Sequence, residues 1–262
     1  MTMVAEPEAE SSFDRMTMIE HLTELRSRLM KSIAAVVAGA IVVWFLWHPI
    51  LDELKEVLCV AVESLDGDQE CKLIITDPLQ GFSTRLTVAG YGGIALAMPV
   101  LLWQLWRFIV PGLYPRERRL AIPFVASGVI LFFAGAGVAY WSLPRALIFL
   151  FEIGGAIDPL LTPDRYINLV VKMIMAFGIA FEFPIVLIFL QLAGMVTPQK
   201  LSSVRRYAIV LIVVFAAVIT PTGDPYTLSF LSVPLYIFFE VSILIGRLAN
   251  RRRLRRESSL TR

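Results

Sequence analysis

Long hydrophobic runs alternate with short polar and charged segments along most of the chain. An apolar helix needs roughly 20 residues to cross the hydrocarbon core of a membrane, and six runs reach or approach this length. Their approximate bounds are Met30–Trp47, Leu86–Trp106, Leu120–Leu143, Tyr166–Leu192, Tyr207–Ile219 and Tyr226–Ile245. The pattern therefore predicts an all-α integral membrane protein with six transmembrane helices.

The last two runs are shorter than the others. The fifth ends close to Pro221, and the apolar part of the sixth, from Tyr226 to Glu240, is only about 21 Å long as a helix, against a core of about 30 Å. Prolines that favour bends interrupt three of the runs, at Pro99, Pro184 and Pro234. Bent helices of unequal length predict a concave, glove-like wall with two short final spans.

The segment before the first run is amphipathic. Apolar residues recur there at helical spacing, and Glu24 lies on the polar side of the predicted helix. Glu24 has two interpretations. It either forms an i,i+4 ion pair with Arg28, worth about 0.3–0.5 kcal/mol, or it accepts a guanidinium group from another molecule.

Charge placement predicts the orientation of the chain. Overall, 57% of the residues are hydrophobic and 18% are charged, as expected for a membrane protein. Arginine and lysine concentrate before the first run, between the second and third, between the fourth and fifth, and after the sixth. Because cytoplasmic loops are rich in these residues, both termini are expected in the cytoplasm, in a cell membrane.

The two ends of the chain differ from the apolar middle. Residues 1–15 are acidic and polar, so we expect a disordered N-terminal tail. Residues 16–246 are expected to form one six-helix membrane domain. Residues 247–262 form a basic cytoplasmic tail, for which anionic membrane lipids are the expected partner.

Cys59 and Cys71 are the only cysteines, and both fall in the first predicted external loop. An outward-facing loop in bacteria is in an oxidising compartment, where a disulfide forms readily. Two free thiols are the alternative.

The sequence gives no sign of catalysis. It contains no phosphate-binding GxxxxGK[ST] motif, no HExxH or GxSxG motif, and histidine only at His21 and His48. We therefore predict no catalytic residues, no metal, no cofactor and no nucleic-acid partner, and we do not expect an enzyme.

Three further acids stand out. Glu117 follows Pro115 and suits the first turn of a helix, or it waits for a positive charge from another molecule. Glu182 lies near the middle of the fourth run, at a cost of roughly 2.5–3.5 kcal/mol, so it is either internally hydrogen bonded or functional. Asp224, in a turn rich in proline and glycine, is expected to cap the last helix.

Four motifs in this order resemble the TatC family, the signal-receptor subunit of the twin-arginine translocase. They are HLTELRSRL before the first run, FIVPGLYPRERRL before the third, FGIAFEFP in the fourth and TPTGDP before the last. The paired loop cysteines and the GDP turn are similar to those of actinobacterial members. Leu228 stands where the family often has glutamine, so contacts with partner helices are expected to differ here.

The resemblance implies a function and roles for single residues. Such proteins bind twin-arginine signal peptides at the cytoplasmic face. With the single-span partners TatA and TatB, and as a homo-oligomer in the receptor complex, they export folded proteins using the proton-motive force. The resemblance assigns peptide binding to Glu24, Glu117, Arg26 and Phe108, an intramembrane partner site to Glu182 and Thr220, and the external turn to Asp224. The alternative is a proton-coupled secondary transporter that uses Glu182 as its intramembrane carboxylate.

Overall fold

The computed structural model describes residues 18–63, 74–109, 121–154, 162–192, 194–220 and 222–260. Within these ranges every regular element is a helix, which confirms the all-α prediction. The helices are α1 (Met18–Phe45), α2 (Trp47–Glu63), α3 (Gln80–Ile109), α4 (Ala121–Gly154), α5 (Pro163–Ala180), α6 (Phe183–Leu192), α7 (Pro198–Ser203), α8 (Arg205–Ile219) and α9 (Pro225–Leu260).

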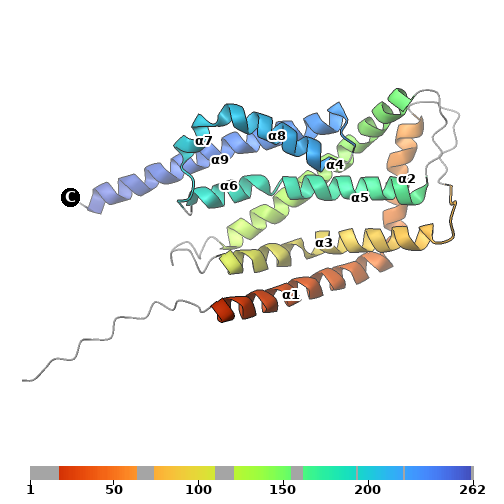
Figure 1. Ribbon diagram of the computed structural model, residues 1–262, viewed down its shortest axis with the longest axis horizontal. Helices are drawn as coiled ribbons and strands as arrows, with labels where there is room; N and C mark the ends of the chain where they lie inside the picture. The colour runs from red at the N-terminus through yellow and green to blue at the C-terminus, as the bar shows by residue number, and fades with distance from the viewer. Residues whose placement is uncertain are drawn as a thin grey trace, which may run out of the picture.

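The apolar helices confirm a multi-pass membrane protein. In the described part of the chain, five segments are long and apolar enough to cross a membrane: Leu22–Phe45, Gln80–Phe108, Ile122–Ile153, Pro163–Gln191 and Pro225–Leu248. Helix α8 has 15 residues and is about 22 Å long, so the sixth crossing stays a prediction. The start of α1 and the end of α9 lie at the same end of the molecule (Figure 1).

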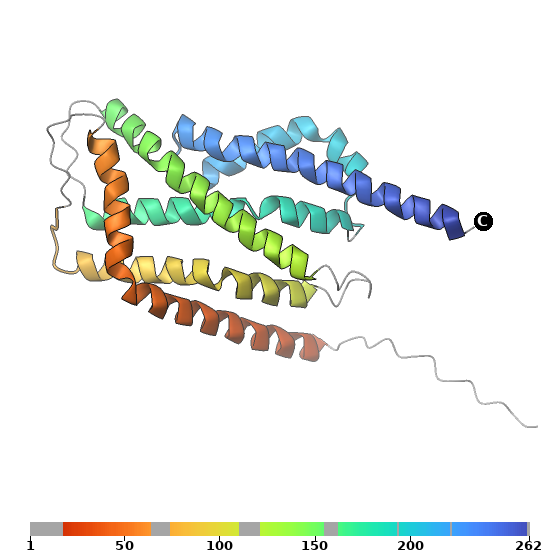
Figure 2. The same ribbon diagram turned by 180° about the vertical axis from the view of Figure 1, so that it is seen from behind.

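Helix α2 was not predicted, because this segment was expected to be a loop. Its apolar residues Leu54, Val57, Leu58 and Ala61 recur at helical spacing and are buried. The helix runs across the end of the molecule opposite the chain ends, next to α4 (Figure 2). The hydroxyl of Tyr166 in α5 donates to the carbonyl of Leu54 at 2.6 Å and ties α2 to the central helices.

The fourth predicted span is broken in two. Helix α5 ends at Ala180, and α6 begins at Phe183. Pro184 has no amide hydrogen to continue the helical ladder, and the amide of Glu182 bonds the carbonyl of Ile179 at 3.1 Å instead of making an i→i−4 bond. The helix is thus interrupted just before Pro184, whereas α3 and α9 continue as helices through Pro99 and Pro234.

Helix α8 is short, as expected, and the apolar segment of α9 extends beyond its expected end at Glu240. The apolar segment of α9 is Pro225–Leu248, 24 residues long. Glu240 does not end this segment, because Arg205 of α8 pairs with its carboxylate and offsets the charge. The helix then continues without interruption across residue 247, the expected start of the tail.

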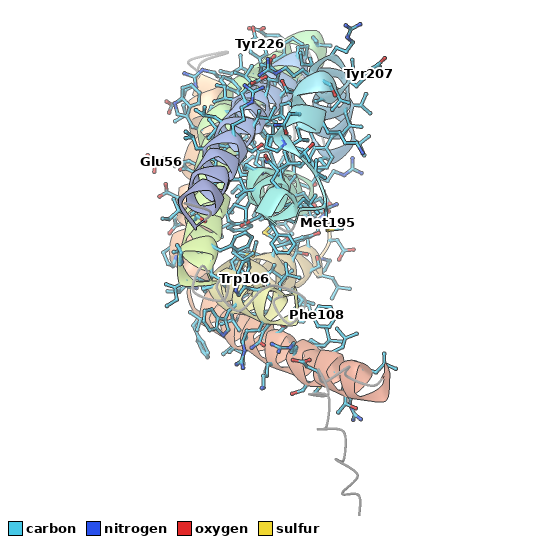
Figure 3. The ribbon with its side chains drawn as sticks, turned by 90° about the vertical axis from the view of Figure 1, so that its left-hand side faces the viewer. Glu56, Trp106, Phe108, Met195, Tyr207 and Tyr226 are labelled. Carbon is cyan, nitrogen blue, oxygen red and sulfur yellow. The ribbon has the colours of Figure 1, made fainter. Side chains whose placement is uncertain are left out.

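Helix α5 forms the centre of the wall, and α1 forms one edge. Seen from the end that holds the chain ends, the helices follow an arc from α1 through α3 and α6 to α8 (Figure 3), as the concave-wall prediction requires. At the edge, α1 crosses α3 at Gly39 and Gly93. A Cβ on Gly93 would lie 2.6 Å from the amide nitrogen of Ala40 and 2.7 Å from the carbonyl oxygen of Val36, so the crossing requires glycine.

Candidate functional site

Glu24 lies in the second turn of α1, on its polar side. Arg28, one turn later, donates to Oε1 of Glu24 through Nε at 3.0 Å and through Nη2. The side chains are 24% exposed for Glu24 and 14% for Arg28. The intrahelical pair considered for Glu24 is therefore formed, and the carboxylate already binds one guanidinium group.

A stripe of exposed leucines lies on the adjacent face of α1. Leu22, Leu25 and Leu29 are each between 42% and 62% exposed, and Arg26 is exposed beside them. The start of α1 thus combines a carboxylate that binds guanidinium with an apolar surface for a neighbouring chain or lipid.

The C-terminal end of α3 lies beside the start of α1. Phe108 is half-buried there, and Figure 3 shows it close to Trp106 at this end of the molecule. Trp106 is only 3% exposed, because it packs against Phe124 of α4 and Phe189 of α6, with ring centroids 4.2 and 5.9 Å apart. This aromatic cluster fixes the end of α3 and thereby the position of Phe108.

Glu117 lies outside the described residues. The proximity of Glu117 to Glu24 therefore stays a prediction. The end of α3 and the beginning of α4 both lie near the start of α1 (Figure 1).

Glu182 lies at the break between α5 and α6. Its carbonyl accepts hydrogen bonds from the amides of Ile185 and Val186, so the residue stands at the start of α6, where the helix dipole favours a negative charge. Its Oε1 is buried and has no hydrogen-bond partner among the described residues. The internal hydrogen bond considered for Glu182 is therefore not formed by Oε1 within the described residues.

Gly128 of α4 makes room for this carboxylate. A Cβ there would lie 3.1 Å from Oε2 of Glu182 and 2.7 Å from Cδ1 of Leu102. Leu102 belongs to a small buried apolar cluster with Met98, Phe132 and Met175. A side chain larger than that of glycine at position 128 would therefore crowd both Leu102 and the carboxylate.

The turn before α9 has the structure predicted for it. Asp224 is 3% exposed, and its Oδ1 accepts the amide hydrogen of Thr227 at 2.8 Å, as a helix cap does. Its Oδ2 accepts the hydroxyl hydrogen of Thr222 at 2.6 Å, and Gly223 supplies a φ of +60°. The capping role is confirmed.

Thr220 ends α8. It is buried, and its hydroxyl donates to the carbonyl of Ala216 at 2.8 Å, so only the oxygen lone pairs remain for a partner. Of the two cysteines, Cys59 lies in α2 and Cys71 lies outside the described residues, so their pairing stays a prediction.

Sequence reasoning missed the polar contacts between helices, including two that join α9 to its neighbours. Nε2 of Gln191 in α6 donates to the carbonyl of Ser242 in α9 at 3.1 Å, and Nη2 of Arg205 in α8 donates to Oε2 of Glu240 in α9 at 2.7 Å. A polar residue inside or at the end of an apolar run indicates that such contacts exist. The sequence does not say which polar residues contact each other.

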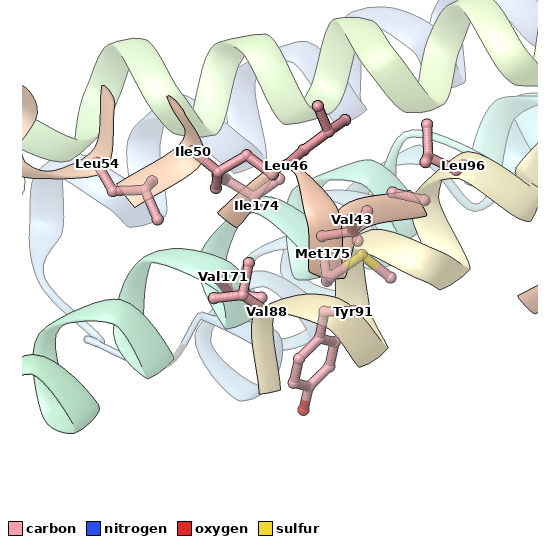
Figure 4. Close-up of a pocket in the computed structure, with 12 residues that line it drawn as sticks. Val43, Leu46, Ile50, Leu54, Val88, Tyr91, Leu96, Val171, Ile174 and Met175 are labelled. Atoms are coloured by element: carbon pink, nitrogen blue, oxygen red, sulfur yellow. The ribbon is translucent and has the colours of Figure 1, made fainter. Parts of the chain in front are cut away.

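An apolar cavity of about 280 Å³ lies where α1, α2, α3 and α5 meet. Figure 4 shows the lining residues Val43 and Met175 close together, while the hydroxyl of Tyr91 points away from them. Val43 lies 19 residues after Glu24 in α1, or roughly 28 Å along the helix axis. The cavity is thus separate from the acidic site at the start of α1.

The described residues contain no group of three or more His, Cys, Asp or Glu side chains that could hold a metal ion.

Comparison with known proteins assigns the family. The family profile described as Sec-independent protein translocase protein (TatC) matches residues 20–234. The TatC protein of Aquifex aeolicus is 40% identical over 242 residues, which cover 91% of this chain and 98% of that protein. That of Frankia casuarinae is 40% identical over 251 residues, which cover 92% of this chain and 68% of that protein.

Solved structures agree with this match. A crystal structure of the twin arginine translocase receptor TatC in DDM aligns with a TM-score of 0.72 and 39% identity, over 87% of this chain and 99% of that one. A second crystal structure of the same receptor gives 0.69 and 39%. This chain belongs to the TatC family of Sec-independent protein translocase proteins.

Proposed function

We propose that this protein is the receptor and core subunit of a twin-arginine protein translocase. It binds signal peptides that carry two adjacent arginines at the cytoplasmic face of the membrane. With the single-span partners TatA and TatB, and as a homo-oligomer in the receptor complex, it exports folded proteins at the expense of the proton-motive force. Both of its termini are cytoplasmic.

The observation that carries this proposal is the geometry of Glu24. Its carboxylate accepts two N–H groups from the guanidinium of Arg28. A signal-peptide arginine would make the same charge-assisted contact by replacing Arg28, and guanidinium suits this geometry better than ammonium does. The exposed leucines beside Glu24 would then cover the apolar segment that follows the arginine pair.

The remaining peptide-site residues complete this arrangement. Glu117 would accept the second arginine. Phe108, positioned by the aromatic cluster at the end of α3, would contact the peptide backbone or its apolar side chains. Arg26 would stay on the exposed side of α1, where its charge repels misplaced cations.

Glu182 and Thr220 are proposed to bind polar groups of the partner helices. The supporting observation is Oε1 of Glu182, which is buried without a hydrogen-bond partner in the described part of the chain. A buried acceptor left unpaired costs roughly 1–3 kcal/mol, and a donor from TatA or TatB would recover this energy.

The same unpaired oxygen favours the second candidate, a secondary transporter that moves protons on Glu182. This candidate predicts solute uptake that Glu182→Gln abolishes. The receptor proposal predicts instead that Glu182→Gln leaves peptide capture intact and weakens crosslinking to the partner helices.

The test is capture of a labelled twin-arginine precursor by the protein, with site-specific crosslinking at positions 24 and 117 as a separate measurement of where the peptide lies. Glu24→Gln should reduce capture roughly tenfold or more, because one charge-assisted contact is worth about 1.5–3 kcal/mol. Capture of a twin-lysine precursor should change far less. Glu56→Gln is the matched control, since Glu56 is an exposed acid on α2 at the other end of the molecule. Equal capture by Glu24→Gln and Glu56→Gln would contradict the proposal.

A further inference from the structure

A small basic cleft lies between the start of α8 and the last apolar turns of α9. It has a volume of about 310 Å³, and its lining residues are Arg205, Glu240, Val241, Ile243, Leu244 and Arg247. We infer that this cleft binds the phosphate of an anionic phospholipid, whose acyl chain lies against the outer face of α9. The inference does not depend on the proposed receptor function.

The polar half of the cleft holds two guanidinium groups in place. Arg205 donates through Nη2 to Glu240, and the hydroxyl of Tyr236 donates to the other carboxylate oxygen of Glu240 at 3.3 Å. Arg247 donates through Nη2 to Oγ of Ser202 at 2.9 Å. Both oxygens of Glu240 are thus engaged, and two arginines against one glutamate leave a net positive charge.

Both arginines keep donors for an anion. A guanidinium group carries five N–H donors. Nε of Arg205 is buried and has no acceptor among the described residues, which is a cost that a phosphate oxygen would remove. Arg247 is exposed and uses one of its terminal nitrogens for Ser202. The planar guanidinium fork matches two oxygens of one phosphate.

The depth of the cleft favours a lipid over a soluble anion. Arg247 stands one residue before the end of the apolar segment of α9 at Leu248, and Arg205 is the first residue of α8. The cleft therefore lies where two membrane helices reach the headgroup region, and basic pockets between helices at this level bind anionic headgroups.

The apolar half of the cleft continues onto a surface that suits an acyl chain. Val241 and Leu244 line the cleft and are 42% and 57% exposed, and Tyr207 at the start of α8 is 69% exposed. A free phosphate ion would leave this surface uncovered, whereas a phospholipid covers it with the chain attached to the phosphate.

Native mass spectrometry of the purified full-length protein tests the inference. Wild type in detergent should retain phosphatidylglycerol in preference to phosphatidylcholine with the same acyl chains. Arg247→Gln should lower the retained phosphatidylglycerol about tenfold, as expected for the loss of one charge-assisted contact. Arg206→Gln, next to the cleft in sequence but not lining it, should retain as much as wild type.

The outcomes that overturn the inference are distinct. If Arg247→Gln and Arg206→Gln lose equal amounts of phosphatidylglycerol, the lipid is attracted by basic residues in general and does not bind in the cleft. Displacement of the lipid by inorganic phosphate at equal concentration would mean a free-anion site. Ser202→Ala, which removes the contact of Arg247 but keeps its charge, should still retain the lipid; a loss as large as that of Arg247→Gln would mean that Arg247 only braces the two helices.

Discussion

Helices α1 and α5 pack against opposite sides of α3, yet their surroundings differ greatly. In the most apolar stretch of α1 only 11% of the residues are buried in the protein, against 50% for the segment of α5 and α6. Helix α1 is attached along one face, where glycine allows a close crossing with α3. Lipid covers the rest, so the membrane tolerates an apolar helix that water would not. Helix α5 therefore holds the fold together, and α1 presents a surface.

The acids on these two helices differ in the opposite sense. Glu24 on the exposed helix is paired with Arg28, whereas Glu182 at the end of the buried helix has an unpaired oxygen in the described part of the chain. Pairing the buried acid and leaving the exposed one unpaired would stabilise the fold more, because an unpaired buried acceptor costs more free energy than an unpaired exposed one. Under the proposed function, the peptide would take the place of Arg28 at Glu24, and a partner helix would bind the unpaired oxygen of Glu182.

The largest expected effect tests the packing half of the comparison. Phe177 in α5 is fully buried in the main apolar core. Phe177→Ala should lower the free energy of unfolding by about 3 kcal/mol, the lower end of the usual range, because burial from lipid gains less than burial from water. Leu29→Ala on exposed α1 should change it by less than about 0.5 kcal/mol. Thermal unfolding in detergent measures both, and equal shifts would remove the distinction between core and edge.

A smaller effect is expected at the crossing that attaches α1. Gly93→Ala should cost about 1–3 kcal/mol, because the new methyl group would meet backbone atoms of α1 that cannot turn away. Gly90→Ala on the same helix is the control, since a Cβ there has no neighbour within 4 Å. The same unfolding measurement applies. Alanine favours a helix over glycine, so Gly90→Ala should not be destabilising. A loss at Gly90 as large as that at Gly93 would mean that the close crossing is not the cause.

A still smaller change is expected beside Glu182. Gly128→Ala should change the free energy of unfolding by about 1 kcal/mol or less, because the new methyl group meets the ends of two flexible side chains, Leu102 and Glu182. It should nevertheless displace the carboxylate and reduce crosslinking to a partner helix. Gly137→Ala, also on α4 and with open space around it, serves as the reference. Unchanged crosslinking in Gly128→Ala would show that the position of the carboxylate is not critical.

The smallest expected effect concerns Arg28. Arg28→Gln removes the intrahelical competitor for Glu24, so binding of a twin-arginine peptide should tighten about twofold, which corresponds to the 0.3–0.5 kcal/mol of such a pair. Titration of the purified protein with a labelled peptide measures this change. A weaker affinity would mean that Arg28 positions Glu24 for the peptide instead of competing with it.

The long apolar runs, and the prolines and turn residues that interrupt them, made much of this fold predictable from the sequence. Periodicity identified the lead-in of α1, proline marked the break before α6, and a turn-forming acid marked the start of α9. Helix α2 was missed because its apolar stripe is short and interrupted by acids, among them Glu53 and Glu56, in a segment flanked by much stronger signals.

The site was predictable in its residues but less so in its pairings. The ion pair of Glu24 with Arg28 is local, so spacing alone proposed it. The pair of Arg205 with Glu240 joins residues 35 positions apart, and its existence depends on how α8 packs against α9. The sequence does not show that Arg205 pairs with Glu240. The end of the sixth apolar segment was therefore predicted at this carboxylate.

Helix α9 is 36 residues long, or about 54 Å, whereas a bilayer including its headgroups is about 40–45 Å thick. A helix of this length projects beyond the lipid at the usual tilt of about 20°. The projecting turns are continuous with the part that packs against α6 and α8, and no flexible joint separates them. A soluble protein that grips those turns would therefore exert torque directly on the wall inside the membrane.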